Sequence, residues 1–370
     1  MSSKYFFFAG GGTGGHIYPS IGVAERVLEI EPEAKIHFFC GSREIDTQVL
    51  AGTGFQYTQL PAKGFSMQPV RLVGFCRSFF DSYRIVNEEI AEGKNAVVLG
   101  AGGYVAAPVC WAAYRMNIPV KILNVDILPG KANKIIANWA NEVFVQFEET
   151  AKYFAGKKLE VTVTGCPLRK RFEGPEPEKV REKLGLEAGK KVLVVTGASS
   201  GSERINKTMC SVLGKLEGFA GGWQIVHLAG KANYEQVRSG YEGVKIGYKV
   251  LDYFDDMADL LAAADLVVGR SGAVSVAEYA AAGVPSVCIP YPYHKDRHQY
   301  LNAEQLVEAG AAVVVDDLPD ASERAEWLAE TLVELMGDEG KLGEMREGCR
   351  EVARVDAGRK VAERLVEALG

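Results

Sequence analysis

Several kinds of segment are missing from this chain of 370 residues, and each absence excludes a class of protein. The seven cysteines are scattered without a Cys-x-x-Cys pair, which favours reduced thiols over a disulfide framework or a zinc site. No run of 18 apolar residues occurs, and the first apolar run begins at Lys4, so neither a membrane-spanning helix nor a signal peptide is expected. The net charge is −6, so general nucleic-acid binding is not expected.

Motifs of several enzyme classes are absent as well. No Asp-x-Asp pair occurs, so a metal-bridged diphosphate is not indicated and no metal site is expected. The chain lacks the Gly-x-x-x-x-Gly-Lys-Ser/Thr motif of P-loop NTPases. The composition is that of a globular protein, 47% hydrophobic and 24% charged, and the length favours two domains.

Two Gly-rich turns, half a chain apart, are the most informative feature. The first is Gly10-Gly-Gly-Thr-Gly-Gly-His16 and the second is Gly197-Ala-Ser-Ser-Gly-Ser202. Each follows an apolar run typical of a buried parallel strand, and each can offer backbone N–H groups to an oxygen-rich ligand at the start of a helix. One such turn suggests a nucleotide domain, and two suggest a pair of them facing each other across a cleft.

Strands and helices are expected to alternate along the whole chain, which is typical of α/β proteins with largely parallel sheets. After the two initial strands, the remaining ones are predicted at residues 36–40, 96–99, 120–123 and 143–146 in the first half, and at 224–228, 244–247 and 266–268 in the second. The strand at 143–146 is expected to be the last of its half. We expect domains at 1–165 and 166–345, with a helical segment, 346–370, packing back toward the first domain.

His16 closes the first turn, where a helix N-terminus disfavours the imidazolium and would keep a neutral base available. A histidine that caps or packs locally is the alternative. Tyr104, in the turn Gly102-Gly-Tyr, is likewise either a cleft-wall aromatic or plain packing. The first turn also fits Gly-x-Gly-x-x-Gly of NAD domains, but Glu44 and Asp46 come too late after the second strand to hold a ribose, which disfavours NAD.

Two segments of the second half favour a ligand site at the carboxyl ends of strands. Ser271, Gly272 and Ala273 open a helix whose N–H groups suit a diphosphate, and Glu278 on that helix is placed to accept hydrogen bonds from a ribose. The polar cluster at 294–302 follows a strand, where open α/β sheets bind ligands. An ordinary loop is the alternative in both places.

A third segment combines arginines with aromatic residues. Arg71, Arg77 and Arg84 recur at helical spacing within 70–84. Such a helix could rest on an anionic membrane surface. A core-facing helix with a charged outer face fits the pattern as well.

Taken together, these segments resemble the MurG family of peripheral membrane glycosyltransferases. Those enzymes add N-acetylglucosamine to undecaprenyl-pyrophosphoryl-muramyl-pentapeptide (lipid I) in peptidoglycan synthesis. The resemblance runs from Gly10 to about Asp316. It is carried by the ordered motifs Gly11-Gly-Thr-Gly-Gly-His-Ile-Tyr-Pro, Gly102-Gly-Tyr-Val, Asp255-Asp-Met, Arg270-Ser-Gly-Ala-Val-Ser-Val-Ala-Glu, Ala281-Ala-Gly-Val-Pro and His294-Lys-Asp-Arg-His-Gln-Tyr-Leu-Asn-Ala.

The resemblance implies the GT-B fold of two Rossmann-like domains, with UDP-N-acetylglucosamine bound mainly by the second, and a place on the cytoplasmic face of the inner membrane. It implies inverting transfer without a metal or other cofactor. His16 would be the catalytic base, and Tyr104 and Asp126 would lie on the acceptor side. The residues implied to bind the donor are Thr13, Gly14, Gly15, Arg169, Ser199, Arg270, Ser271, Gly272, Ala273, Val274, Ser275, Glu278, Gln299 and Asn302.

The chain departs from the family's pattern on both sides of this implied site. The family's acceptor-side His-Glu-Gln-Asn is Leu123-Asn-Val-Asp126 here. Its paired glutamines are His298-Gln299, and its Gly-Gly-Ser-Gln-Gly-Ala turn is Gly-Ala-Ser-Ser-Gly-Ser at 197–202. Three alternatives therefore stay open: a MurG-like paralogue with another UDP-sugar or polyprenyl acceptor, a UDP-N-acetylglucosamine 2-epimerase, and a UDP-sugar-binding scaffold without acceptor chemistry.

Overall fold

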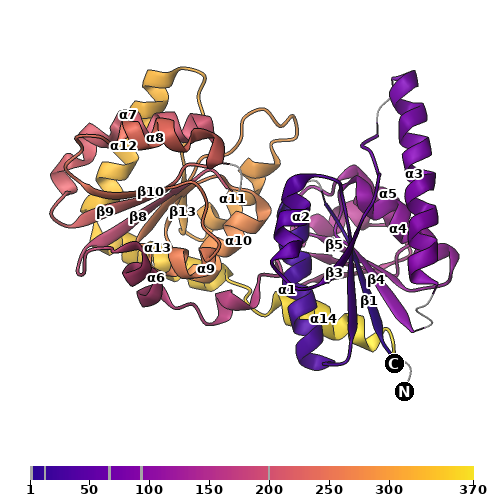
Figure 1. Cartoon of the computed structure of the whole chain (residues 1–370). Coiled ribbons are helices and arrows are strands. Elements are labelled where there is room, and N and C mark those ends of the chain that lie inside the picture. Colours follow the sequence, from indigo (N-terminus) through magenta and orange to yellow (C-terminus); the bar gives the residue numbers. More distant parts are fainter. Residues whose placement is uncertain (1–2, 12–13, 66–67, 92–94, 199–200) are drawn as a thin grey trace. The chain divides into compact units, whose positions relative to one another are not determined.

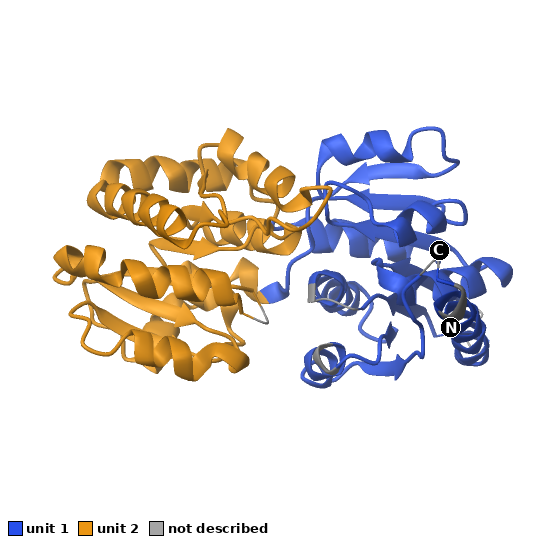
Figure 2. Cartoon of the chain, turned by 90° about the horizontal axis from the view of Figure 1, so that it is seen from above, with its two compact units in different colours: residues 1–170, 355–370 blue, residues 171–354 orange. Residues whose placement is uncertain are grey.

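The computed structural model describes residues 3–11, 14–65, 68–91, 95–198 and 201–370. The chain divides into two compact units, residues 1–170 with 355–370 and residues 171–354 (Figure 2). Each unit holds one parallel sheet covered by helices (Figure 1). The expected α/β architecture with two parallel sheets is therefore confirmed.

The sheet of the first unit has the strand order β3-β2-β1-β4-β5-β6-β7. Its strands are β1 (Tyr5–Ala9), β2 (Lys35–Cys40), β3 (Gln56–Gln59), β4 (Ala96–Gly100), β5 (Val120–Asn124), β6 (Glu142–Val145) and β7 (Glu160–Val163). Its helices are α1 (Gly14–Ile30), α2 (Glu44–Ala51), α3 (Pro69–Ile90), α4 (Gly103–Arg115), α5 (Lys131–Ile136) and α14 (Ala357–Glu367). The order reverses between β1 and β4, which makes a topological switch point.

The sheet of the second unit has the order β10-β9-β8-β11-β12-β13 and reverses between β8 and β11. Its strands are β8 (Lys191–Thr196), β9 (Trp223–Leu228), β10 (Gly247–Leu251), β11 (Leu266–Gly269), β12 (Ser286–Cys288) and β13 (Ala312–Val314). Its helices are α6 (Pro177–Leu184), α7 (Glu203–Leu216), α8 (Tyr234–Gly240), α9 (Met257–Ala262), α10 (Ala273–Ala282), α11 (His298–Glu308), α12 (Ala321–Gly337) and α13 (Glu339–Val352).

Central strands are apolar throughout because both of their faces are covered. In β1, Phe6 and Phe8 lie on one face of the sheet and Phe7 and Ala9 on the other, and all four are buried. The same double burial explains the unbroken apolar run of β8. Such runs need helices on both sides of the sheet, as the alternating pattern predicts.

Two strand predictions were wrong, both at the edge of a sheet. The strand at 143–146 does not end its sheet, because β7 pairs with β6 beyond it. The strand expected at 244–247 is β10, displaced to Gly247–Leu251, while the apolar Val244 and Ile246 pack on the core from the turn before it. Edge strands are partly exposed, so their sequences lack the apolar run that marks a central strand.

The end of the chain packs on the first unit, where α14 lies against α1 (Figure 1). Two glycines, Gly22 of α1 and Gly358 of α14, each permit a close approach to this part of α1. A Cβ at position 22 would lie 2.5 Å from the carbonyl oxygen of Leu168, and a Cβ on Gly358 of α14 would lie 3.3 Å from the carbonyl oxygen of Gly22. The Nε atom of Arg364 in α14 also lies 2.9 Å from Oε1 of the buried Glu142. No described helix has the length and apolar character needed to cross a bilayer.

Candidate active site

The first candidate site lies at the carboxyl ends of β1 and β4, where the order of the first sheet reverses. Gly11 follows β1, and Gly102 and Gly103 follow β4. The two turns touch, since a Cβ on Gly103 would lie 2.4 Å from the carbonyl oxygen of Gly11. Gly102 and Gly103 have φ values of +100° and +74°, which L side chains rarely adopt. Glycine is thus required here by both space and backbone conformation.

His16 lies half-buried in the first turn of α1, beside these glycines. Its Nδ1 atom is 3.1 Å from the carbonyl oxygen of Gly11. Because a carbonyl oxygen can only accept, Nδ1 carries the proton in this contact and Nε2 is the basic nitrogen of the neutral ring. Burial lowers the pKa of His16 below its usual value, and the carboxylates of Asp126 and Asp46 oppose that shift. The environment therefore favours a neutral imidazole, as a general base requires.

Asn133 in α5 was not predicted, yet it lies beside His16. Its Oδ1 atom is buried and makes no hydrogen bond among the described residues. A Cβ at Gly102 would be 3.4 Å from this oxygen and 3.2 Å from Nε2 of His16, so both polar atoms border one small space. The Nδ2 atom of Asn133 donates to Oδ1 of Asn124 at 2.9 Å. The only feature of the sequence that could have pointed to Asn133 is its place on the buried face of a short helix, three residues before the buried Ile136.

The two predicted acceptor-side residues lie in the same unit. Tyr104 begins α4, packs against the core of the sheet, and has its hydroxyl 3.2 Å from where a Cβ on Gly41 would lie. Asp126 is half-buried in the loop after β5, and its backbone oxygen accepts a 2.6 Å hydrogen bond from Nδ2 of Asn124. Gly14 and Gly15 form the start of α1, whereas Thr13 lies outside the described residues.

The second candidate site lies at the carboxyl ends of β8 and β11. Arg270 follows β11 and is buried. Its guanidinium donates to the carbonyl oxygens of Ile289 at 2.9 Å and Pro290 at 3.2 Å, and to Oγ of Ser202 at 2.9 Å. Burial lowers the pKa of Arg270, and the carboxylate of Asp317 opposes the shift. Arg270 thereby joins the turn after β8 to the turn after β11.

Asp317 is a buried carboxylate that three arginines share. It lies 2.6 Å from Nε of Arg204, 3.0 Å from Nη1 of Arg270 and 3.8 Å from Nε of Arg324. Arg204 also donates from Nη1 to the hydroxyl of Tyr293 at 2.7 Å. Apart from Arg270 these residues were not predicted to be part of the site, and Arg204 and Asp317 meet across 113 residues of sequence.

The remaining predicted donor residues of the second half gather at the same end of the sheet. The Ser271 hydroxyl donates to the carbonyl oxygen of Gln299 at 2.9 Å, and Asn302 donates from Nδ2 to the carbonyl oxygen of Ser271 at 3.4 Å. Gly272 is the N-cap of α10 and has no side chain to cap its first N–H groups. Ala273, Val274, Ser275 and Glu278 follow on that helix, with Glu278 half-buried.

Besides Thr13, Gly14 and Gly15 of the first unit, two further predicted donor residues are not part of this group. Arg169 belongs to the first unit, where its guanidinium lies 4.9 Å from the centre of the Tyr18 ring. Ser199 lies outside the described residues. Their roles in donor binding stay predictions.

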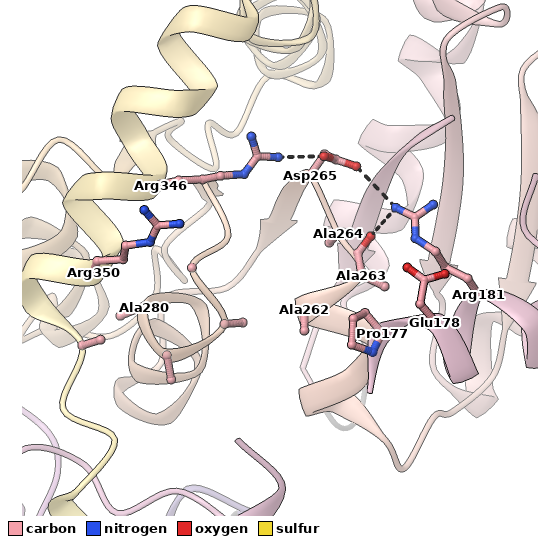
Figure 3. Close-up of a pocket in the computed structure, with 14 residues that line it drawn as sticks. Pro177, Glu178, Arg181, Ala262, Ala263, Ala264, Asp265, Ala280, Arg346 and Arg350 are labelled. Carbon is pink, nitrogen blue, oxygen red and sulfur yellow. Dashed lines mark hydrogen bonds and ion pairs between the residues drawn. The ribbon is translucent and has the colours of Figure 1, made fainter. Parts of the chain in front are cut away.

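A cavity of about 510 Å³ lies elsewhere in the second unit (Figure 3). Arg181 and Arg346 line it and both pair with Asp265, at 3.7 Å and 2.7 Å. Asp265 directly precedes β11, so the cavity lies at the amino end of that strand, at the opposite edge of the sheet from Arg270. No predicted site residue lines it. Within the described ranges, no three His, Cys, Asp or Glu side chains are grouped as a metal site would require.

Comparison with known proteins identifies the family. The glycosyltransferase family 28 N-terminal domain matches residues 6–145, and its C-terminal domain matches residues 192–359. The UDP-N-acetylglucosamine–N-acetylmuramyl-(pentapeptide) pyrophosphoryl-undecaprenol N-acetylglucosamine transferase of Caldanaerobacter subterraneus subsp. tengcongensis is 34% identical over 365 residues, which cover 96% of this chain and 97% of the relative. The crystal structure of Acinetobacter baumannii MurG matches with a TM-score of 0.73 and 25% identity, covering 98% of this chain and 99% of that one. The chain belongs to the MurG family.

Membership of the MurG family confirms the expected GT-B fold and makes the protein a glycosyltransferase. The UDP-GlcNAc 2-epimerase of Neisseria meningitidis, solved with UDP-GlcNAc bound, matches with a TM-score of 0.70 over 99% of this chain and the whole of the other. Its sequence identity is only 13%, so this likeness shows a shared fold and nothing about the reaction.

Proposed function

We propose that this MurG family member transfers N-acetylglucosamine from UDP-N-acetylglucosamine to the muramyl-pentapeptide of lipid I, in peptidoglycan synthesis. The name of its 34%-identical relative supports this donor and acceptor. The observation that carries the proposal is the setting of His16, whose ring contacts the carbonyl oxygen of Gly11 at the switch point of the first sheet and whose pKa is lowered by burial. A transferase that moves a sugar onto a hydroxyl needs a base in that state.

The second unit supplies the groups that we assign to the donor, apart from Arg169 of the first unit. The N–H groups at the start of α10 and the guanidinium of Arg270 would stabilise the negative charge that develops on departing UDP. Glu278 would accept hydrogen bonds from the ribose. Arg169 and Ser199 are assigned to the diphosphate, on the resemblance described above.

The first unit supplies the groups that we assign to the acceptor. Nε2 of His16 removes the proton of the attacking hydroxyl while that oxygen bonds to the anomeric carbon. The C–O bond to UDP breaks on the opposite face of the sugar, so the configuration inverts. The charge that develops on UDP is stabilised by protein N–H groups and guanidinium groups, and we propose that no metal ion is needed.

We further propose that α3 holds the enzyme on the cytoplasmic face of the inner membrane. On its outer side Val73 and Phe80 are 70% and 66% exposed, which a purely core-facing helix does not explain. Arg71, Arg77 and Arg84 are exposed on the same helix and would attract anionic lipids. Phe80→Ser should reduce co-sedimentation with phosphatidylglycerol vesicles but leave UDP release from a soluble lipid-I analogue unchanged. Equal vesicle binding by wild type and variant would contradict this part of the proposal.

One assay tests the reaction. UDP release from UDP-N-acetylglucosamine is followed with a lipid-I analogue, in EDTA, and the anomeric configuration of the product is read by NMR. We expect turnover, an inverted product and no loss of rate in EDTA. Donor binding without turnover on any muramyl acceptor would contradict the proposal. Conversion of the donor to its manno epimer without acceptor would replace it with epimerisation.

A second candidate keeps the donor and changes the acceptor. Leu123 in β5 and Val125 in the loop after it stand at positions where the family's pattern is polar, and both side chains are buried. A paralogue that glycosylates another polyprenyl-linked acceptor fits this loop. Faster turnover with a plain polyprenyl phosphate than with the lipid-I analogue would favour it.

A further inference from the structure

We propose that Asp317 and Ser202 are positioning residues for Arg270, and that they set the affinity of the second unit for UDP. This inference rests on the proposed function, because it assumes that the donor binds at the carboxyl ends of β8 and β11. It concerns how the site is held in shape before the donor arrives. Neither residue was part of the site predicted from the sequence.

Ser202 connects two turns that follow different strands. It is the N-cap of α7, and its Oγ atom accepts from the backbone N–H of Ile205 at 3.4 Å. The same oxygen accepts from Nη2 of Arg270 at 2.9 Å. A single hydroxyl therefore fixes the end of the Gly-rich turn after β8 to the guanidinium that follows β11. In the family's Gly-Gly-Ser-Gln-Gly-Ala pattern this position is alanine, so the contact belongs to this chain.

Asp317 holds the guanidinium from another side. Its carboxylate lies 3.0 Å from Nη1 of Arg270 and 2.6 Å from Nε of Arg204, and Arg204 is itself fixed to the carbonyl oxygens of Asp317 and Leu318 at 3.0 Å and 2.6 Å. The two arginines would repel each other in a buried place without this carboxylate. Asp317 thus allows both cations to lie at the same end of the sheet.

The cluster also has a charge that suits an anion. Arg204, Arg270 and Arg324 share the single carboxylate of Asp317 among the contacts of the described residues. Positive charge is therefore in excess at a largely buried place, beside the N-terminus of α10. Binding a diphosphate there relieves the excess, and this favours UDP over uridine.

The first test measures UDP affinity by calorimetry, without any acceptor. Ser202→Ala should raise the Kd for UDP about tenfold, the usual effect of losing one hydrogen bond to a charged group. Ser202→Thr should restore it, since it returns the hydroxyl. Ser211→Ala, which removes a hydroxyl from the exposed side of the same helix, is the matched control and should not change the Kd.

The second test removes the charge. Asp317→Asn keeps the shape of the side chain and should raise the Kd for UDP about 100-fold. Asp338→Asn, at the N-cap of α13, is the matched control and should bind UDP as the wild type does. Should Asp317→Asn fail to fold, the Ser202 variants alone decide the matter.

A double-mutant cycle separates positioning from general damage. If Ser202 acts through Arg270, Ser202→Ala in an Arg270→Lys background should change the Kd less than twofold. In the wild-type background Ser202→Ala should raise the donor KM, and in the Arg270→Lys background it should not raise the donor KM further, which a merely structural loss would not produce.

The outcomes distinguish this inference from the function on which it rests. Wild-type UDP affinity in Arg270→Lys would overturn the proposed donor site itself. Weak binding in Arg270→Lys with unchanged binding in Ser202→Ala would overturn only the positioning role. Full additivity of Ser202→Ala and Arg270→Lys would overturn it as well, because independent residues do not act through one another.

Discussion

The two units share a plan and differ in the charge at the carboxyl ends of their central strands. In the first, the carboxylates of Asp46 and Asp126 act on one histidine, His16. In the second, three arginines surround the carboxylate of Asp317. The same doubly wound sheet therefore presents a half-buried histidine in one unit and an excess of positive charge in the other. Topology decides where such a site lies, and the turn residues decide what it can do.

The largest expected effect on turnover comes from removing the proposed base, His16. His16→Ala should lower kcat with a lipid-I analogue by about 10²–10⁴-fold, the usual contribution of a general base. The Kd for UDP should stay within twofold, because we assign UDP to the other unit. His37→Ala removes a histidine of the same unit that instead contacts Thr58, and it should retain turnover. A tenfold loss of UDP affinity in His16→Ala would contradict the division of labour between the units.

The next effect tests the space beside the base. A Cβ at Gly102 would meet the His16 ring at 3.2 Å, so Gly102→Ala should displace the ring and lower kcat about 100-fold. Gly54→Ala is the matched control, since its φ is also positive, +75°, but its Cβ would meet no atom within 4 Å. Both variants should lose about 1 kcal/mol of unfolding free energy. Equal loss of turnover in both would show that strain, and not contact with His16, is responsible.

A substitution of Glu278 tests the proposed donor site of the second unit by itself. Glu278→Gln should raise the Kd for UDP about tenfold, because a carboxylate accepts a stronger hydrogen bond from a ribose hydroxyl than an amide does. The variant should bind UDP and 2′-deoxy-UDP almost equally, whereas the wild type should prefer UDP. Calorimetry with both nucleotides checks this. Unchanged preference for UDP in the variant would remove Glu278 from the ribose site.

A smaller effect concerns the backbone of the second turn. Ala198 has φ +64°, a value that costs a residue with a Cβ about 1 kcal/mol or more. Ala198→Gly should therefore raise the free energy of unfolding by about 1 kcal/mol, measured by denaturant titration. Ala220→Gly, at φ −56°, should lower it or leave it unchanged. A destabilised Ala198→Gly variant would show that the turn is not strained.

The smallest effect is a shift along the pH axis. The base is active when neutral, so kcat/KM should rise as pH passes upward through the pKa of His16, which burial lowers from its usual value. The Asp126 carboxylate favours the imidazolium and opposes this shift. Asp126→Asn should therefore lower the pKa further and move the acid limb of the profile to lower pH. A shift to higher pH would contradict the electrostatic role of Asp126.

The sequence predicts those parts of the fold that are buried on both sides. The central strands β4 and β11 lie within one residue of their predicted bounds, 96–99 and 266–268, because a core on both faces of a sheet demands a continuous apolar run. Edge strands need no such run, and for that reason the strand predicted to begin at residue 244 begins three residues later, as β10.

The candidate site likewise contains residues that the sequence predicts and residues that it does not. Ser271, Gln299 and Asn302 stand in ordered motifs, and the structure joins them by hydrogen bonds. Asn133 and Asp317 stand in no motif that marks them. Their importance arises from contacts between segments far apart in the chain, and single-sequence patterns carry no information on such contacts.

The packing of the last helix on α1, beside Gly22, has a consequence for the order in which the two units are made. The segment at Leu168 and the helix α14 both rest on the same turn of α1. The first unit is therefore interrupted in the chain by the whole of the second and ends only with residues 355–370. During synthesis from the N-terminus, residues 171–354 of the second unit are therefore made before the last helix of the first unit. The unit that begins the chain is the last to be finished.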